Sequence, residues 1–519
     1  MYQENPANIS TPAEEALTSQ TERFKLALRP RSPEYIQYLT DIYRVHLEQE
    51  RSLLAQRDIE DLKATGQFPR DSTPFDVVSN PVLQNIEHIV YGQVERHIYL
   101  EVLTHQTVLD TFRQNQARTW EPLSPKEIPV LDSCLEEREA VTYEDFVLSI
   151  GEGEPSESSA QTVLGTGLVV KGTTETVCFP ICGSSMSALN SANGSENLGL
   201  SGAMSFVPID AEWGNPHKQA LMLNESHRLL RVDPFLTNHE EAEYLINRAT
   251  GLMGITLKAD PADALTRVET ILNEVEYLDG DHKLLCRVYD PRSMQRMVKT
   301  VFALRDSRYG DKVVIVGGKV TNRSQALALV KAGAHAVDIG VGEGEICDTP
   351  GVTSATGNNL LTAYQIAREG LQIPLICDGG TGRQIPIAIA IGASVAMKSR
   401  ALSGGTYEHN PTGWVYSNGV DGRGFKRYFG EASDAEKWYG KKFDPTGNDV
   451  MFLEGSVGRV EMDSRYPSIT KRQFKMLEGL ATACIFQRIA SLEELQRNPH
   501  PDVWKYTSHA AMRASVHHN

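Results

Sequence analysis

A cysteine at position 347 lies in a glycine-rich segment whose composition is compatible with nucleophilic chemistry. Residues 336–357 read AVDIGVGEGEICDTPGVTSATG, and a predicted strand ends at Gly340, shortly before Cys347 and Thr349. Glycines allow the backbone to curl tightly around a ligand or an ion. A cysteine on such a loop attacks an electrophilic carbon as the thiolate when its pKa is lowered. The alternative, which is commoner for an arbitrary cysteine, is a small apolar side chain packed in a turn.

Alternating strands and helices are predicted to position this loop. From about residue 140, short β-branched apolar runs alternate with helical segments such as Arg323–Ala332, Asn359–Arg368 and Ile385–Ile391. Repeated βα units favour a parallel α/β sheet, and eight would close a (β/α)8 TIM barrel with its active site at the carboxyl ends of the strands. An open doubly wound sheet is the alternative, weakened because no G-x-G-x-x-G follows the first strand. The expected strands are Val177–Cys182, Met204–Val207, Leu252–Leu257, Lys283–Val288, Val313–Val316, Ala336–Gly340, Pro374–Cys377 and Ser394–Met397.

The amino-terminal part of the chain has a different pattern. Ser32-Pro33 and Asn80-Pro81 are typical helix starts, and each is followed by apolar residues at helical spacing. Many glycine, tyrosine and charged residues interrupt the βα pattern late in the chain, which indicates a functional flap. The predicted division is a disordered tail at 1–31, a helical extension at 32–139, and a catalytic barrel at 140–519 with a flap at 404–460.

Composition limits the partners and the location. The 51 basic and 67 acidic residues give a net charge of −16, which disfavours nucleic acids and anionic membranes as partners. We find no apolar run of membrane-spanning length, and the polar amino terminus lacks the pattern of a signal peptide. The seven scattered cysteines indicate reduced thiols and a cytoplasmic location. A zinc site is not expected, because no second Cys or His pair lies near Cys178 and Cys182.

The loop around Cys347 closely resembles the G-x-G-x-x-C-x-T loop of inosine-monophosphate (IMP) dehydrogenases and GMP reductases. Gly342, Gly344, Cys347 and Thr349 match this motif as they stand. The resemblance extends through roughly residues 142–490, and the ordered set of motifs is far more specific than any single one. The other matching segments are TYEDFVLS (142–149), FPICGSSMSAL (179–189), VIVGGKV (314–320), PLICDGG (374–380) and FLEGSVGRV (452–460).

The resemblance implies a purine nucleotide oxidoreductase. In that family the thiolate adds to C2 of the purine and a hydride passes to or from a nicotinamide, so Cys347 is cast as nucleophile, with Thr349 and Glu454 handling the proton. It also implies NAD or NADP as cofactor and a homotetramer. Substrate-site positions are Ser184, Met186, Lys319, Glu345, Asp378, Gly379, Gly380, Ser399, Arg400 and Tyr428. Cofactor positions are Arg287, Asp290, Gly340 and Gly342, and those for a monovalent cation, K+, are Gly342, Gly344 and Cys347.

Three features favour the reductase direction, in which ammonia leaves C2 of GMP. The interval 208–250 is too short for the regulatory paired-repeat module that the dehydrogenases usually insert there. WYGKKF, at 438–443, stands where the dehydrogenase flap has an Arg-Tyr pair, and residues 253–276 align most naturally with the reductases. Two alternatives remain: a dehydrogenase that converts IMP to XMP with NAD, with Lys441 or Lys442 replacing the flap arginine, and a non-catalytic nucleotide-binding paralogue.

Several positions depart from the family pattern in charge. Arg287 stands where the family has an Asp that holds the nicotinamide ribose, and Asp290 is a compensating carboxylate three residues later. Lys319 replaces an Asn of the substrate site, and Asp338 replaces a basic or polar residue.

The phosphate pocket also departs from the family pattern. Glu345 replaces a Ser that donates to phosphate, and like charges in contact cost on the order of a few kcal/mol. Arg400, in the segment that replaces the family's M-x-G-S, can restore a cation by binding phosphate or by pairing with Glu345. A nucleotide held through Arg400 and an altered ligand without phosphate are both compatible with this pattern.

Overall fold

A computed structural model describes Gly92 and most of the chain beyond residue 94. The expected tail at 1–31 and nearly all of residues 32–94 lie outside the described residues, so the division of the chain into regions stays a prediction. The described residues after Gly92 are 95–116, 127–151, 168–169, 177–186, 189–209, 215–279, 282–290, 293–341, 349, 353–371, 373–380, 382–409, 416–417, 424–430, 433, 457–462, 465–489, 491–497 and 503–508.

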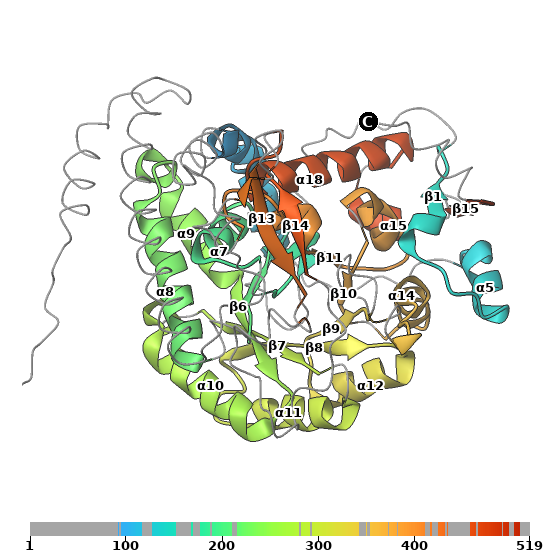
Figure 1. The fold of residues 1–519 in the computed structure, drawn as a ribbon, viewed down its shortest axis with the longest axis horizontal. Coiled ribbons are helices and arrows are strands. Elements are labelled where there is room, and N and C mark those ends of the chain that lie inside the picture. The colour runs from blue at the N-terminus through green and yellow to red at the C-terminus, as the bar shows by residue number, and fades with distance from the viewer. Residues whose placement is uncertain are drawn as a thin grey trace, which may run out of the picture.

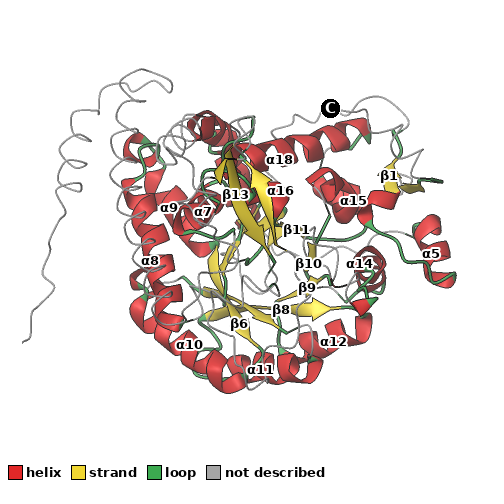
Figure 2. Cartoon of the chain, viewed as in Figure 1, coloured by secondary structure: helices red, strands yellow, loops and turns green. Residues whose placement is uncertain are grey.

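Eight parallel strands form the centre of the molecule, enclosed by helices (Figures 1 and 2). Their order is β4-β11-β10-β9-β8-β7-β6-β5, and a parallel bridge between Cys182 and Met204 joins the first strand to the last. The predicted (β/α)8 barrel is therefore confirmed, and the open doubly wound sheet is excluded. The strands are β4 (Ile181–Gly183), β5 (Ser205–Val207), β6 (Met253–Lys258), β7 (Leu284–Tyr289), β8 (Val313–Val320), β9 (Ala336–Ile339), β10 (Leu375–Asp378) and β11 (Val395–Lys398).

The sequence predicted one strand over Val177–Cys182, and this prediction is wrong in one respect, because the structure has two strands there. β3 (Val177–Cys178) pairs antiparallel with β2 (Leu168–Val169), whereas β4 begins the barrel. Pro180 separates them, and a proline has no N–H to continue a ladder of hydrogen bonds. The other strand predictions are confirmed to within a few residues. The largest difference is at β8, which continues through Gly317 and Gly318 to Val320.

Local sequence sets the helix boundaries. Asn322 accepts a hydrogen bond from the backbone N–H of Gln325 at 3.0 Å, and Gly333 ends that helix at φ +100°, a conformation that favours glycine. The predicted Arg323–Ala332 and Asn359–Arg368 are confirmed, and the third helix ends one residue early. The barrel helices are α7 (Ala192–Leu200), α8 (Pro216–Val232), α9 (Ala242–Gly251), α10 (Pro261–Glu274), α11 (Met294–Asp306), α12 (Arg323–Ala332), α14 (Asn359–Arg368), α15 (Ile385–Ala390), α16 (Arg400–Ser403), α18 (Ile469–Phe486) and α19 (Leu492–Arg497).

Segments that precede the barrel pack directly on it. Phe112, in α4 (Gln106–Gln116), makes an edge contact with Phe179, with ring centroids 4.9 Å apart. The Tyr364 hydroxyl of α14 accepts a hydrogen bond from the N–H of Ile128, which precedes α5 (Pro129–Glu136), at 2.7 Å. β1 (Phe146–Leu148) pairs antiparallel with β15 (Val503–Lys505), so a segment that precedes the barrel strands meets one that follows them.

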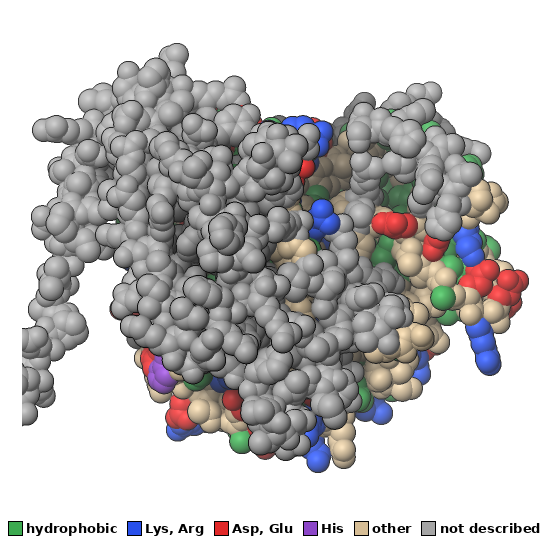
Figure 3. Space-filling model, viewed as in Figure 1, with side chains coloured by type: hydrophobic (Ala, Val, Ile, Leu, Met, Phe, Trp, Pro, Cys, Tyr) green, Lys and Arg blue, Asp and Glu red, His purple; other side chains and the backbone are tan. Residues whose placement is uncertain are grey.

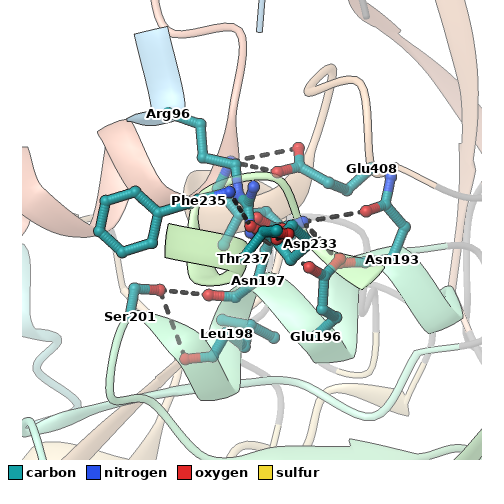
Figure 4. Close-up of polar contacts among 11 residues, drawn as sticks. Arg96, Asn193, Glu196, Asn197, Leu198, Ser201, Asp233, Phe235, Thr237 and Glu408 are labelled. Atoms are coloured by element: carbon teal, nitrogen blue, oxygen red, sulfur yellow. Dashed lines mark hydrogen bonds and ion pairs between the residues drawn. The ribbon is translucent and has the colours of Figure 1, made fainter. Parts of the chain in front are cut away.

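A buried group of charges joins helical residues 95–103 to the barrel (Figure 4). Arg96 lies 2.6 Å from the Asp233 carboxylate and 3.1 Å from that of Glu196, and all three side chains are almost completely buried. Burial raises the pKa of Glu196, whereas for Asp233 the attraction of Arg96 outweighs burial and lowers the pKa. Glu408 lies beside this group and accepts hydrogen bonds from the N–H of Ile469, at 3.2 Å to each oxygen.

An antiparallel sheet lies over the barrel opening in the view of Figure 1. It contains β12 (Tyr416–Ser417), β13 (Gly424–Phe429) and β14 (Val457–Glu461), and most of the remaining residues between 410 and 456 lie outside the described part. No helix among the described residues is both long enough and apolar enough to cross a membrane.

On the described part of the face in Figure 3, acidic and basic side chains are interspersed along the lower edge.

Candidate functional site

The predicted site residues that the structure describes converge on one end of the barrel. Because the eight strands are parallel, their carboxyl ends share that end. Of the predicted residues, Gly342, Gly344, Glu345, Cys347 and Glu454 lie outside the described residues. Those at or just beyond the strand ends are Ser184 and Met186 (β4), Arg287 and Asp290 (β7), Lys319 (β8), Gly340 (β9), Asp378, Gly379 and Gly380 (β10), and Ser399 and Arg400 (β11).

Asp378 and Lys319 form an ion pair at this mouth. The Lys319 ammonium donates to Oδ2 of Asp378, and the Asp378 side chain keeps 27% of its surface exposed. Burial alone would raise the pKa of Asp378, but attraction to Lys319, and then to Arg287 and Lys398, outweighs it and lowers that pKa. Asp378 is therefore an ionised carboxylate, open to solvent on one side, that can accept hydrogen bonds from a ligand.

Arg287 is directed into the barrel interior. Its Nε donates to Asp338 Oδ2 at 2.7 Å, and another guanidinium nitrogen donates to the Ser185 hydroxyl at 2.7 Å. Its side chain is 3% exposed and its guanidinium stacks over the ring of Tyr289, 4.8 Å from the centroid. The two positions at which the charge departs from the family pattern, 287 and 338, are thus paired with each other. The second Asp338 oxygen lies 3.6 Å from Lys319 Nζ.

The turn after β10 is held by Lys398, a residue that was not among the predicted site residues. Lys398 Nζ donates to the Gly379 carbonyl at 2.5 Å and lies 3.4 Å from the Gly380 carbonyl. Both glycines have positive φ, and a Cβ on Gly380 would lie 2.6 Å from Gln384 Oε1. The only sequence signal was a lysine that ends the apolar run Val395–Met397, which reads equally well as a solvent-exposed strand end.

The base of the cysteine loop is fixed on both sides. Val341, after β9, donates its N–H to the Asn359 side chain at 2.9 Å and accepts from the Gly357 N–H at 3.0 Å. A Cβ on Gly340 would come within 3.0 Å of Asp378, so glycine permits the close approach of β9 and β10 here. Thr349 is buried, and its carbonyl accepts from the Thr353 hydroxyl at 2.6 Å. The loop that carries Cys347 therefore starts and ends beside Asp378.

β13 brings the predicted residue Tyr428 to the mouth. The Tyr428 hydroxyl, in β13, lies 3.4 Å from that of Ser399, and its ring packs in a small apolar cluster with Leu189, Val460 and Met186. The backbone N–H of Ser184 donates to the Lys398 carbonyl at 3.0 Å. These contacts place Ser184, Met186, Ser399 and Tyr428 around one side of the opening.

The described residues contain no group of three or more His, Cys, Asp or Glu side chains that could hold a metal ion. Cys178 and Cys182 are both fully buried, and burial raises the pKa of the Cys182 thiol. The residues predicted to hold a monovalent cation lie outside the described part, so that cation stays a prediction.

Comparison with known proteins identifies the family. A closed parallel barrel with polar residues at the strand ends is an architecture used by many enzymes. The sequence model of one protein family, described as the IMP dehydrogenase / GMP reductase domain, matches residues 140–518 of this chain. The chain therefore belongs to this oxidoreductase family.

Curated relatives carry the name inosine-5'-monophosphate dehydrogenase. That of Mycobacterium tuberculosis is 30% identical over 283 residues, covering 51% of this chain and 48% of the relative. That of Escherichia coli K12 is 34% identical over 199 residues, 37% of this chain and 39% of the relative, and that of Aquifex aeolicus is 32% identical over 193 residues, 36% and 38%. The matched part of this chain thus covers less than half of the length of each of these relatives.

Proposed function

We propose that the protein is a purine nucleotide oxidoreductase that binds its nucleotide at the barrel mouth and uses Cys347 as nucleophile. The observation that carries this proposal is the convergence of Asp378, Gly379 and Gly380 with both ends of the cysteine loop, in a member of this family. The ionised Asp378 accepts hydrogen bonds from ribose hydroxyls. The glycine turn gives the nucleotide phosphate close access to the backbone.

The reductive reaction would proceed in two stages at C2 of GMP. The Cys347 thiolate forms a bond to C2, and ammonia leaves with a proton supplied through Thr349 and Glu454, which gives a thioimidate. A hydride is then added to C2 and the thiolate leaves, which gives IMP. The role of this chain's residues is to hold the purine over Cys347 and to move the proton.

A nicotinamide, NAD or NADP, would supply or accept the hydride when bound. The residues fit this group in part. Arg287 has only N–H donors, which cannot accept from a ribose diol, and it is buried against Asp338 and Ser185. Asp290 is a carboxylate at the same strand end. We therefore propose Asp290 and the backbone at Gly340 as the contacts for the nicotinamide half.

The direction of the reaction has two candidates. The absence of an inserted module favours reduction of GMP, because the described residues between β5 and β6 contain only α8, α9 and the short η4 (Leu236–Asn238). The names of the relatives favour oxidation of IMP. In this alternative we propose that XMP forms with NAD and that Gly342, Gly344 and Cys347 would hold K+. We place the reductase first, and we also propose a cytoplasmic location and a homotetramer. Light scattering on the purified protein would test the tetramer.

One experiment separates these candidates. Purified protein is mixed with GMP and NADPH, or with IMP and NAD, and the nicotinamide absorbance is followed, while a 6-chloropurine nucleotide is used to trap Cys347 for mass spectrometry. Consumption of NADPH with GMP supports the reductase, and formation of NADH with IMP supports the dehydrogenase. No turnover and no adduct would leave a non-catalytic nucleotide-binding protein.

A further inference from the structure

Five charged side chains form a continuous ladder across neighbouring strands at the barrel mouth. Arg287 contacts Asp338, Asp338 lies 3.6 Å from Lys319, Lys319 donates to Asp378, and Lys398 donates to the carbonyls that follow Asp378. The strands β7, β9, β8, β10 and β11 supply these residues in that order. With three cations and two carboxylates, the ladder carries one excess positive charge.

The ladder depends on a glycine where it crosses β8. Arg287 and Asp338 belong to β7 and β9, which lie on either side of β8, so their contact passes over β8. In the register of the sheet Gly318 is the residue opposite Asp338, and a Cβ on Gly318 would lie 2.6 Å from the Asp338 Cβ. A side chain at 318 would therefore push Asp338 away from its two cations.

One member of the ladder is accessible. The side chains of Arg287, Asp338 and Lys319 are 3%, 0% and 7% exposed, and Lys398 is buried, whereas Asp378 is 27% exposed. A ligand in the mouth therefore meets the Asp378 carboxylate, and the other four side chains act on the ligand through it.

We propose that Lys319 is a positioning residue that fixes the Asp378 carboxylate and makes the site select ligands that combine a negative charge with hydroxyl donors. This inference rests on the proposed function. Lys319 bridges two carboxylates that would otherwise repel each other, so its ammonium sets the distance between them. The excess positive charge attracts an anion, while the orientation of Asp378 favours a diol such as that of a ribose phosphate.

A positioning role of Lys319 affects the pH dependence of ligand binding, whereas a purely structural role would not. Lys319 makes the largest attractive contribution that lowers the pKa of Asp378, and burial opposes it. Without the ammonium, the pKa of Asp378 must rise, and the carboxylate must become protonated at higher pH. Ligand binding would then weaken as the pH falls.

The test compares Lys319→Met with Lys319→Arg by calorimetric titration of GMP and IMP between about pH 5 and about pH 8. The nucleotide phosphate itself titrates near about pH 6, so each variant is compared with wild type at the same pH. We expect Lys319→Met to lose about tenfold or more relative to wild type toward the acidic end, and Lys319→Arg to retain the wild-type profile. Lys312→Met is the matched control, because Lys312 is exposed at the opposite end of the same strand. If Lys319→Met does not fold, Lys319→Gln takes its place with the same expectation.

A Lys319→Met profile identical to that of wild type would overturn the inference. If wild-type protein binds neither nucleotide, the proposed function fails, and the ladder is then tested without ligand. For that purpose the melting temperatures of Lys319→Met, Asp378→Asn and the double variant are compared. Non-additive shifts support the coupling of Lys319 to Asp378, and additive shifts refute it.

Discussion

The guanidinium of Arg287 and the carboxylate of Asp338 lie 2.7 Å apart inside the barrel, although their strands are not neighbours. Both side chains are almost completely buried, so each needs the other to compensate its charge. The pair explains why two positions that each depart from the family pattern in charge are compatible with one stable fold.

Exchanging the two charges tests this pairing. Arg287→Asp and Asp338→Arg should each lower the free energy of unfolding by about 3–5 kcal/mol, because each leaves like charges buried together. The double variant should recover part of that loss, as measured by chemical denaturation. Arg228→Ala, in an exposed pair with Glu225, is the control and should have little effect. A double variant as unstable as the sum of its parents would contradict direct pairing.

Two glycine substitutions should have opposite effects on stability. Gly318→Ala would place a Cβ 2.4 Å from the Asp338 carbonyl oxygen, so we expect a loss on the order of 1–3 kcal/mol. Gly479→Ala, in α18, has nothing within 4 Å of the new Cβ and should stabilise the protein by up to about 1 kcal/mol. Denaturant titration measures both. Equal changes in the free energy of unfolding would show that Gly318 and Asp338 are not tightly packed where the Arg287–Asp338 contact passes over β8.

Glu408 should make stability depend on pH. Burial raises its pKa from the usual 4.5 to about 7, so the folded protein holds this proton more tightly than the unfolded chain does. Its stabilising contribution is complete below about pH 4.5 and is lost as the pH rises through about 7, a change on the order of 3 kcal/mol.

Glu408→Gln removes this contribution, so the difference in unfolding free energy between wild type and variant should shrink over that window. The difference is needed because His97, whose pKa is lowered to about 4 mainly by burial, has the opposite pH dependence. Exposed Glu101→Gln is the control and should leave the profile unchanged. A wild-type-minus-variant difference that is flat with pH would mean that Glu408 is ionised in the folded protein.

Cysteine reactivity should be confined to the loop. A chloropurine nucleotide should modify Cys347 and spare Cys134, whose thiol has its pKa raised to about 11, mainly by burial. Cys347→Ala should abolish turnover while nucleotide binding persists, and Cys134→Ala should leave the labelling intact. Peptide mapping by mass spectrometry identifies the labelled residue. Labelling that survives in Cys347→Ala would exclude Cys347 as the nucleophile.

Much of the fold was predictable because local signals act within short stretches of sequence. Runs such as Val313–Val316 predicted buried strands, and the helix predicted at Arg323–Ala332 has the same bounds in the structure. The prediction for Val177–Cys182 joined two strands because apolar character alone does not show where a proline breaks the ladder of hydrogen bonds.

The pairing of charges was less predictable than their positions. Arg287 and Asp338 each stood out in the sequence, but their contact depends on the register of three strands and on a glycine in the middle one. Lys398 gave only a weak signal, because its partners are backbone carbonyls in the turn after β10, and any residue type has a carbonyl. The roles of the predicted site residues remain predictions that the experiments above test.

The buried position of Arg96 has a consequence for the order in which the chain matures during synthesis. Its partner Glu196 is 100 residues downstream, and Asp233 and Glu408 follow later still. An arginine without its carboxylates resists burial, so Arg96 is not stably buried before they are made. Helical residues 95–103 therefore leave the ribosome before their carboxylate partners, and they reach their buried position only after the chain through at least Asp233 has been made.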